Sequence, residues 1–94
     1  MRAQQIMAIA EAAGIGCLIG TMGELQIASA AAAHLGVACA NIPYTCDLVG
    51  PLRYNESIVE ETLRLEDGLF YPPEAPGLGI TPKWEVINRW RVAG

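Results

Sequence analysis

The chain has 94 residues, of which 52% are hydrophobic and 17% are charged, and its formal net charge is −4. This length predicts one compact domain or a piece of a larger one. The acidic balance argues against nucleic acid and anionic membranes as partners, because both select basic surfaces. Cys17, Cys39 and Cys46 are an odd number of thiols in apolar stretches, which predicts small buried thiols in a reducing, cytoplasmic compartment.

The longest stretch without a charged side chain covers residues 25–46 and is long enough to be considered as a membrane span. It contains Gln26, which would be costly in hydrocarbon, and Pro43, which breaks a helix. We therefore expect a helix, a turn and a strand here. The amino end leads from Arg2 into an amphipathic segment, and we expect no targeting signal there.

The first part of the chain predicts a helix followed by a strand. Residues 3–13 carry apolar side chains at helical spacing, and Gly14 suits the helix end. The stripe that this helix should bury consists of Ile6, Ile9, Ala10 and Ala13. Residues 15–20 form a short apolar run without polar alternation, which is typical of a strand covered on both faces.

A second helix and a second strand are predicted next. Residues 24–40 are rich in alanine at helical spacing, which allows close approach to neighbouring elements. The expected buried face consists of Ile27, Ala31, Leu35 and Ala38. Pro43 breaks the helix, and residues 44–49 form an apolar run with Asp47 near its end. Two strands joined by one helix predict a right-handed parallel pair.

The remainder of the chain is more polar. Residues 63–71 alternate apolar and polar side chains on both sides of Asp67-Gly68, which predicts a hairpin. A rigid loop rich in proline and glycine follows over residues 72–79. Thr81 and Pro82 suit the cap and first position of a final helix. This helix carries Trp84, Ile87 and Trp90, and its two tryptophans should pack against different surfaces.

Two lone parallel strands would leave open edges and uncovered apolar faces. A chain of this size buries only about 60 to 65% of its unfolded surface, which makes a thin core. We therefore expect either further strands or another chain to complete the sheet.

Five motifs occur in an order that is familiar from one enzyme family. They are GIGCLIGTMGE at 14–24, AAAAHL at 30–35, CDLVGPL at 46–52, EDG at 66–68 and PGLGI at 76–80. Together they resemble the carboxy-terminal part of the mandelate racemase and muconate lactonizing enzymes of the enolase superfamily. The DLVGPL and PGLG runs look more like the muconate lactonizing branch than the acid-sugar dehydratase branch.

The resemblance implies an α/β fold, namely a carboxy-terminal fragment of a TIM-type (β/α) barrel. This fragment would contain two parallel strands with flanking helices, a hairpin and a final helix. Residues 1–52 would form the last β/α units, and residues 53–94 would form the carboxy-terminal return segment. Active sites of such barrels lie at the carboxy ends of the strands, where Glu24 and Asp47 fall.

The resemblance also implies a chemistry. Enzymes of this family use lysine bases on the second and sixth strands. Three carboxylates on the third to fifth strands hold magnesium, which stabilises an enolate formed by proton abstraction next to a carboxylate. By the resemblance none of these strands lies in this chain, whose single lysine is Lys83. We therefore expect no complete catalytic set, no metal ligand and no cofactor in this chain alone.

Glu24 and Asp47 are the candidate substrate-binding residues. Glu24 either faces the bound carboxylic acid or a catalytic group, or interacts with free N–H groups at the start of a helix. Asp47 either lines the same pocket or makes a structural hydrogen bond to loop backbone. Val49 stands where related dipeptide epimerases carry a second aspartate, which argues against that specificity.

His34 and the cysteines suggest other sites less strongly. We interpret His34 as a packed, hydrogen-bonded core residue rather than a general base or metal ligand. His34 and the three cysteines together contain the elements of a zinc site, but the sequence has no Cys-x-x-Cys pair. Buried thiols are therefore the favoured interpretation.

Two classes of function follow from these observations. The first is part of a magnesium-dependent cycloisomerase or racemase, with a small carboxylic acid as substrate and the rest of the barrel as partner. The second is a non-catalytic folding or oligomerisation module, in which self-association covers the open strand edges.

Overall fold

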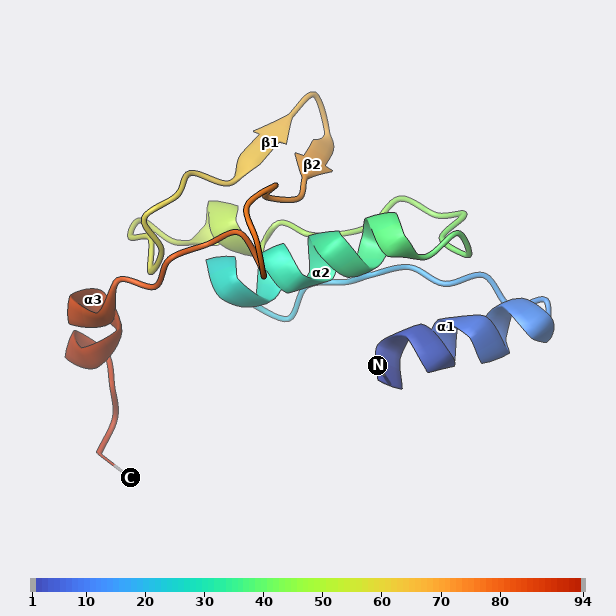
Figure 1. The fold of residues 1–94 in the computed structure, drawn as a ribbon, viewed down its shortest axis with the longest axis horizontal. Helices are drawn as coiled ribbons and strands as arrows, with labels where there is room; N and C mark the ends of the chain where they lie inside the picture. Colours follow the sequence, from blue (N-terminus) through green and yellow to red (C-terminus); the bar gives the residue numbers. More distant parts are fainter. Residues whose placement is uncertain (1, 94) are drawn as a thin grey trace.

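The computed structural model describes residues 2–93. Its elements are α1 (Arg2–Ala12), α2 (Gln26–Ala38), the 3₁₀ helix η1 (Gly50–Arg53), β1 (Arg64–Glu66), β2 (Leu69–Tyr71) and α3 (Trp84–Arg89). Figure 1 shows α2 in the middle of the molecule, the β1–β2 hairpin to one side of it, and α1 and α3 at opposite ends. No helix in the described part of the chain is long and apolar enough to cross a membrane.

The two predicted parallel strands are extended segments rather than regular strands. Residues 15–20 and 44–49 run in the same direction beside α2 (Figure 1). Two backbone hydrogen bonds join this part of the chain, from Cys17 N–H to the Asn41 carbonyl at 3.3 Å and from Asp47 N–H to the Ile19 carbonyl at 2.9 Å. So few bonds do not make a regular ladder. The predicted parallel pair is therefore not confirmed, and the hairpin is the one regular sheet within residues 2–93.

The hairpin forms where the sequence predicts it. β1 and β2 pair antiparallel with Arg64 opposite Tyr71, Leu65 opposite Phe70 and Glu66 opposite Leu69. The turn residues Asp67 and Gly68 have φ values of 51° and 76°. Positive φ at both central positions is the geometry of the type I′ turn, whose twist matches that of the two strands.

The first two helices bury other faces than the sequence predicts. In α1 the buried residue is Met7, whereas Ile6 and Ile9 are 64% and 70% exposed. In α2 the buried residues are Gln26, Ser29, Ala30 and Ala33. The sequence predicts instead a buried face of Ile27, Ala31, Leu35 and Ala38. The small side chains on that face let α2 pack directly against η1. The spacing of hydrophobic residues in the sequence does not predict that α2 and η1 approach so closely.

The last helix starts later than predicted. Lys83, not Thr81, is the N-cap of α3. Pro82 instead forms an isolated antiparallel bridge with Val59, which is fully buried. Backbone bonds on either side run from Glu60 N–H to the Thr81 carbonyl at 2.9 Å and from Lys83 N–H to the Ile58 carbonyl at 2.8 Å. These bonds keep residues 81 and 82 extended and attach the last part of the chain to the core.

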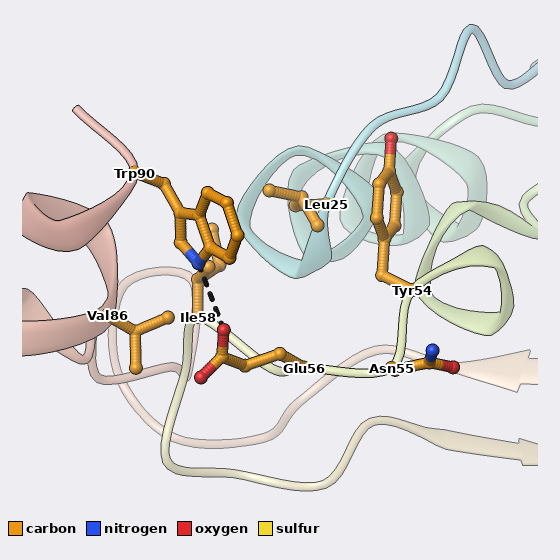
Figure 2. Close-up of a pocket in the computed structure, with 7 residues that line it drawn as sticks. All are labelled: Leu25, Tyr54, Asn55, Glu56, Ile58, Val86 and Trp90. Atoms are coloured by element: carbon orange, nitrogen blue, oxygen red, sulfur yellow. Dashed lines mark hydrogen bonds between the residues drawn. The ribbon is translucent and has the colours of Figure 1, made fainter. Parts of the chain in front are cut away.

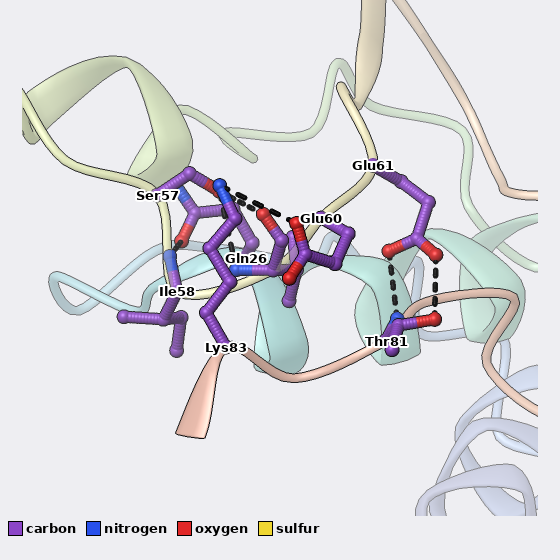
Figure 3. A network of polar contacts seen from close by, with 8 residues as sticks. Gln26, Ser57, Ile58, Glu60, Glu61, Thr81 and Lys83 are labelled. Atoms are coloured by element: carbon purple, nitrogen blue, oxygen red, sulfur yellow. Dashed lines mark hydrogen bonds and ion pairs between the residues drawn. The ribbon is translucent and has the colours of Figure 1, made fainter. Parts of the chain in front are cut away.

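Polar side chains reinforce this attachment (Figure 3). The Glu61 carboxylate accepts the Thr81 N–H at 2.7 Å and the Thr81 hydroxyl at 2.8 Å. These two bonds hold the pKa of the Glu61 carboxyl below its ordinary value. Gln26, buried at the start of α2, accepts the Ile58 N–H at 3.3 Å. Thr81 therefore serves as a partner of Glu61 rather than as a helix cap.

Many large apolar side chains of this chain stay exposed. The buried hydrophobic residues are Met7, Ala30, Ala33, Val59 and Val86. Trp84 and Trp90 are 64% and 70% exposed, so the prediction that each packs against a separate surface is wrong. The Trp90 indole N–H is bonded to Glu56, but most of both rings faces solvent, because α3 is a six-residue helix at one end of the molecule (Figure 1). The small core agrees with the thin core expected from the length of the chain.

Candidate active-site edge

Glu24 lies in a tight turn between the first extended segment and α2. Gly23, just before it, has a φ of 87°. The Glu24 carboxylate folds back over this turn and accepts the Met22 N–H at 2.6 Å. The side chain is half-buried, and α2, capped by Leu25, has no side-chain cap hydrogen bond. Glu24 therefore binds the backbone of its own turn and not the free N–H groups of the helix.

Asp47 lies at the end of the second extended segment. Its backbone is bonded in both directions, because its N–H donates to the Ile19 carbonyl at 2.9 Å and its carbonyl accepts the Thr21 hydroxyl. The residue is exposed. The side-chain carboxylate has no hydrogen-bond or ion-pair partner among residues 2–93. Its backbone is thus fixed while its carboxylate faces solvent.

The structure brings the ends of the two extended segments together. The Thr21 hydroxyl joins the stretch before Glu24 to Asp47. On the other side, η1 begins against the Glu24 turn, since a Cβ added to Gly50 would lie only 2.1 Å from the Glu24 carbonyl oxygen. The two candidate residues therefore share one edge of the molecule, which we call the candidate active-site edge (residues 21–24 and 47–50).

An apolar cavity of about 390 Å³ lies next to this edge. The sequence does not predict it. Its walls are Leu25, Tyr54, Asn55, Glu56, Ile58, Val86 and Trp90 (Figure 2). These residues come from three separate parts of the chain, and no motif in the sequence indicates that they meet.

Glu56 ties α3 to the wall of this cavity. Its carboxylate accepts the Trp90 indole N–H at 3.0 Å (Figure 2) and pairs with the Arg89 guanidinium at 2.7 Å. The bond from Trp90, helped by the charge of Arg89, holds the pKa of the Glu56 carboxyl below its ordinary value. The carboxylate is thus already engaged and leaves the cavity walls largely apolar.

His34 and the cysteines do not assemble into a site. The His34 Nε2 lies 3.3 Å from the Leu78 carbonyl, which joins α2 to the proline- and glycine-rich loop. Cys17, Cys39 and Cys46 are free and half-buried, rather than buried as predicted. Cys17 and Cys46 lie on extended segments that are not covered on both faces, and Cys39 is the C-cap of α2. In the described range 2–93, no three histidine, cysteine, aspartate or glutamate side chains come together as metal ligands.

The chain is similar to proteins of known family. Residues 1–86 match the family model described as enolase C-terminal domain-like. The chain is 36% identical over 89 residues to muconate cycloisomerase 1 of Rhodococcus opacus, covering 95% of this chain and 24% of that protein. A chloromuconate cycloisomerase of Cupriavidus necator is 36% identical over 86 residues, covering 92% of this chain and 23% of that protein.

Solved structures show the same relationship. The crystal structure of 2-chloromuconate cycloisomerase from Rhodococcus opacus 1CP superposes with a TM-score of 0.88 at 29% identity, over 98% of this chain and 25% of that one. The muconate lactonizing enzyme from Pseudomonas putida gives a TM-score of 0.81 at 38% identity, over 88% and 23% of the two chains. The chain thus spans about a quarter of the length of these relatives. It belongs to the mandelate racemase and muconate lactonizing enzyme family of the enolase superfamily, and matches the C-terminal part of that family's proteins.

Proposed function

We propose that this chain supplies the carboxy-terminal part of the active site of a magnesium-dependent cycloisomerase or racemase. The reaction would begin with proton abstraction next to a carboxylate in a small carboxylic acid. In this proposal residues 1–52 form the last β/α units of a TIM-type barrel, and residues 53–94 form the return segment. The support is the match to muconate and chloromuconate cycloisomerases over more than nine-tenths of the chain.

The observation that carries the proposal is the meeting of Glu24 and Asp47 at one edge. Both follow extended apolar segments that run in the same direction, as site residues at the carboxy ends of barrel strands do. Two carboxylates alone would repel an anionic substrate. We therefore propose that they line the pocket by accepting hydrogen bonds from cationic or donor groups that also face the substrate.

The magnesium ion does not fit residues 2–93, because they bring no three metal-ligating side chains together. The Glu24 carboxylate is also engaged by the Met22 N–H at 2.6 Å. In this proposal, residues supplied by the rest of the active site hold the metal and act as bases. This chain alone is then inactive and needs no cofactor of its own. Its three free cysteines support a reducing, cytoplasmic environment.

A graft tests the proposal. This chain would replace the matching carboxy-terminal quarter of the Rhodococcus opacus muconate cycloisomerase, and loss of the ultraviolet absorbance of muconate would be followed. We expect turnover by the graft. Glu24→Gln and Asp47→Asn should each lower kcat/KM by about tenfold or more, which corresponds to about 1.4 kcal/mol of transition-state stabilisation.

Glu85→Gln is the matched control, because Glu85 is an exposed carboxylate on α3, away from the candidate active-site edge. It should leave kcat/KM unchanged. Wild-type turnover in a folded graft that carries both Glu24→Gln and Asp47→Asn would show that the site assignment is wrong.

A second candidate function is a non-catalytic folding or association module. It is favoured by the exposed apolar side chains of α1 and the first extended segment, where Ile6, Ile9, Ile15 and Leu18 are all more than half exposed. Exposed apolar side chains of this kind mark an interaction site where they form one patch. Its partner would be a second copy of the chain or the rest of a barrel.

A further inference from the structure

The turn that carries Glu24 is flexible by composition and fixed by its contacts. Gly23 has a φ of 87°, a region open to glycine among many others, so the turn has no strong conformational preference of its own. In the observed arrangement the Glu24 carboxylate accepts the Met22 N–H at 2.6 Å. A contact from outside the turn can hold this arrangement.

Tyr54 is the side chain that contacts the turn from outside. Its hydroxyl donates to the Gly23 carbonyl at 2.6 Å, across 31 residues of sequence. A Cβ added to Gly23 would lie 3.4 Å from the same hydroxyl oxygen. The bond is short, as expected for a well-aligned O–H donor and carbonyl acceptor, and it fixes the peptide unit that precedes Glu24.

The ring of Tyr54 borders the apolar cavity and is 45% exposed. It forms one wall, opposite Trp90 and beside Leu25, and its hydroxyl points away from Asn55 and Glu56 (Figure 2). Leu25, another wall of this cavity, directly follows Glu24, so the cavity lies beside the turn that the Tyr54 hydroxyl contacts. Tyr54 directly follows η1, whose first residue, Gly50, packs against the Glu24 carbonyl.

We propose that Tyr54 is a positioning residue, whose hydroxyl holds the Gly23 carbonyl and thereby directs the Glu24 carboxylate. The inference deepens the proposed function and rests on it, because Glu24 matters there as a pocket carboxylate. Through η1, Tyr54 also couples the arrangement of Glu24 to the segment that carries Asp47. A tyrosine with no contact to the turn could not act in this way.

The test is a double-mutant cycle read at the Met22 amide proton by NMR, on the whole chain. Glu24→Gln removes the charge that this N–H faces and should move its resonance strongly in the wild-type background. In the Tyr54→Phe background the same substitution should move it by less than half as much. Tyr44→Phe is the matched control, because Tyr44 is 59% exposed and its hydroxyl has no hydrogen bond within residues 2–93.

A purely structural role for Tyr54 would lower stability in Tyr54→Phe but leave the effect of Glu24→Gln on Met22 undiminished, which would overturn the proposal. A second measurement needs no Tyr54 variant: Glu24→Gln alone should move the ring resonances of Tyr54 and not those of Tyr44. An unmoved Tyr54 would equally overturn it. Neither NMR measurement contains a ligand. The expected NMR shifts, combined with a graft whose turnover is unchanged by Glu24→Gln and Asp47→Asn, would therefore refute the proposed function and not the positioning role of Tyr54.

Discussion

One glycine, Gly50, decides how closely the backbone packs at the candidate active-site edge. Gly50 is buried at the start of η1, and an added Cβ would lie 2.1 Å from the Glu24 carbonyl oxygen and 3.1 Å from the Ser29 hydroxyl oxygen. The nearest obstacle is backbone, which cannot move aside like the end of a flexible side chain. The absence of a side chain at position 50 is therefore what allows η1 to contact the Glu24 turn.

Gly50→Ala should lower the free energy of unfolding by about 1 to 3 kcal/mol, the usual cost of overpacking. Chemical denaturation followed by circular dichroism measures it. Gly20→Ala is the control, since its added Cβ would meet its nearest neighbour, in the Leu18 side chain, at 4.0 Å. Equal stability of the two variants would show that the close contact at Gly50 is not formed.

The sequence predicts Glu24 and Asp47 as candidate site residues, but it does not predict which residues surround them. A carboxylate after an apolar run is conspicuous, and the family motifs place it at a strand end. Tyr54 lies in none of the motifs, and Gly50 lies in CDLVGPL without any sign of a close contact. The importance of both comes from contacts with residues 31 and 26 positions away. Pairwise contacts over such separations leave no local periodicity in one sequence.

At the scale of elements, those formed by contacts between residues close in sequence are predicted well, and those that depend on distant residues are not. The hairpin is encoded locally by Asp67-Gly68 and the alternation around it, and it forms as predicted. The parallel pairing of residues 15–20 and 44–49 depends on neighbours on both faces, and the structure has two backbone bonds there instead of a ladder. The start of α3 is displaced because the bridge between Val59 and Pro82 prevails over a local capping preference.

The hairpin turn requires glycine at its second position. Gly68 has a φ of 76° and open space around its Cβ position, so Gly68→Ala costs backbone strain only, about 1 kcal/mol. Hydrogen exchange of the β1 and β2 amides should become about fivefold faster. Asp67→Asn should leave it unchanged, because Asn-Gly also suits a type I′ turn. Unaltered exchange in Gly68→Ala would contradict the turn assignment.

The attachment of α3 should depend on pH. The folded-state pKa values of Glu56 and Glu61 lie below the ordinary 4.5, so their charged forms stabilise the folded chain at pH values above 4.5. This stabilisation is lost as the pH falls through the lowered pKa values. Trp90 should therefore report detachment of α3 below pH 4.5, as a change of fluorescence in a Trp84→Phe background.

Glu56→Gln keeps the side-chain shape and removes the charge, so most of the acid-induced change should disappear. Glu85→Gln, which removes a carboxylate on α3 itself, is the control and should retain it. The same acid transition in both variants would mean that Glu56 does not hold α3 through its charge.

At the scale of the whole molecule, the exposed apolar surface calls for a partner. Ile6 and Ile9 are 64% and 70% exposed on α1, on a helix whose stripe the sequence predicts to be buried. In the family to which the chain belongs, relatives are about four times longer. We propose that the surface exposed here is covered in the complete catalytic unit, or by self-association of the isolated chain.

Self-association through this surface has a direct test. The combined substitutions Ile6→Ser and Ile9→Ser should lower the mass of the purified chain measured by light scattering, from that of an oligomer toward that of a 10.0 kDa monomer. Val92→Ser, at a residue that is 85% exposed near the other end of the molecule, should leave the mass unchanged. An oligomer that persists in the α1 variant would place the interface elsewhere.

We propose that this chain contributes to a cycloisomerase active site that it does not complete. The most direct test is the rate of muconate loss in three samples: this chain, the remaining amino-terminal part of the Rhodococcus opacus muconate cycloisomerase, and the two mixed. We predict turnover in the mixture and none in either part alone. Turnover by this chain alone, or an inactive mixture in which the two parts form a complex, would contradict the account.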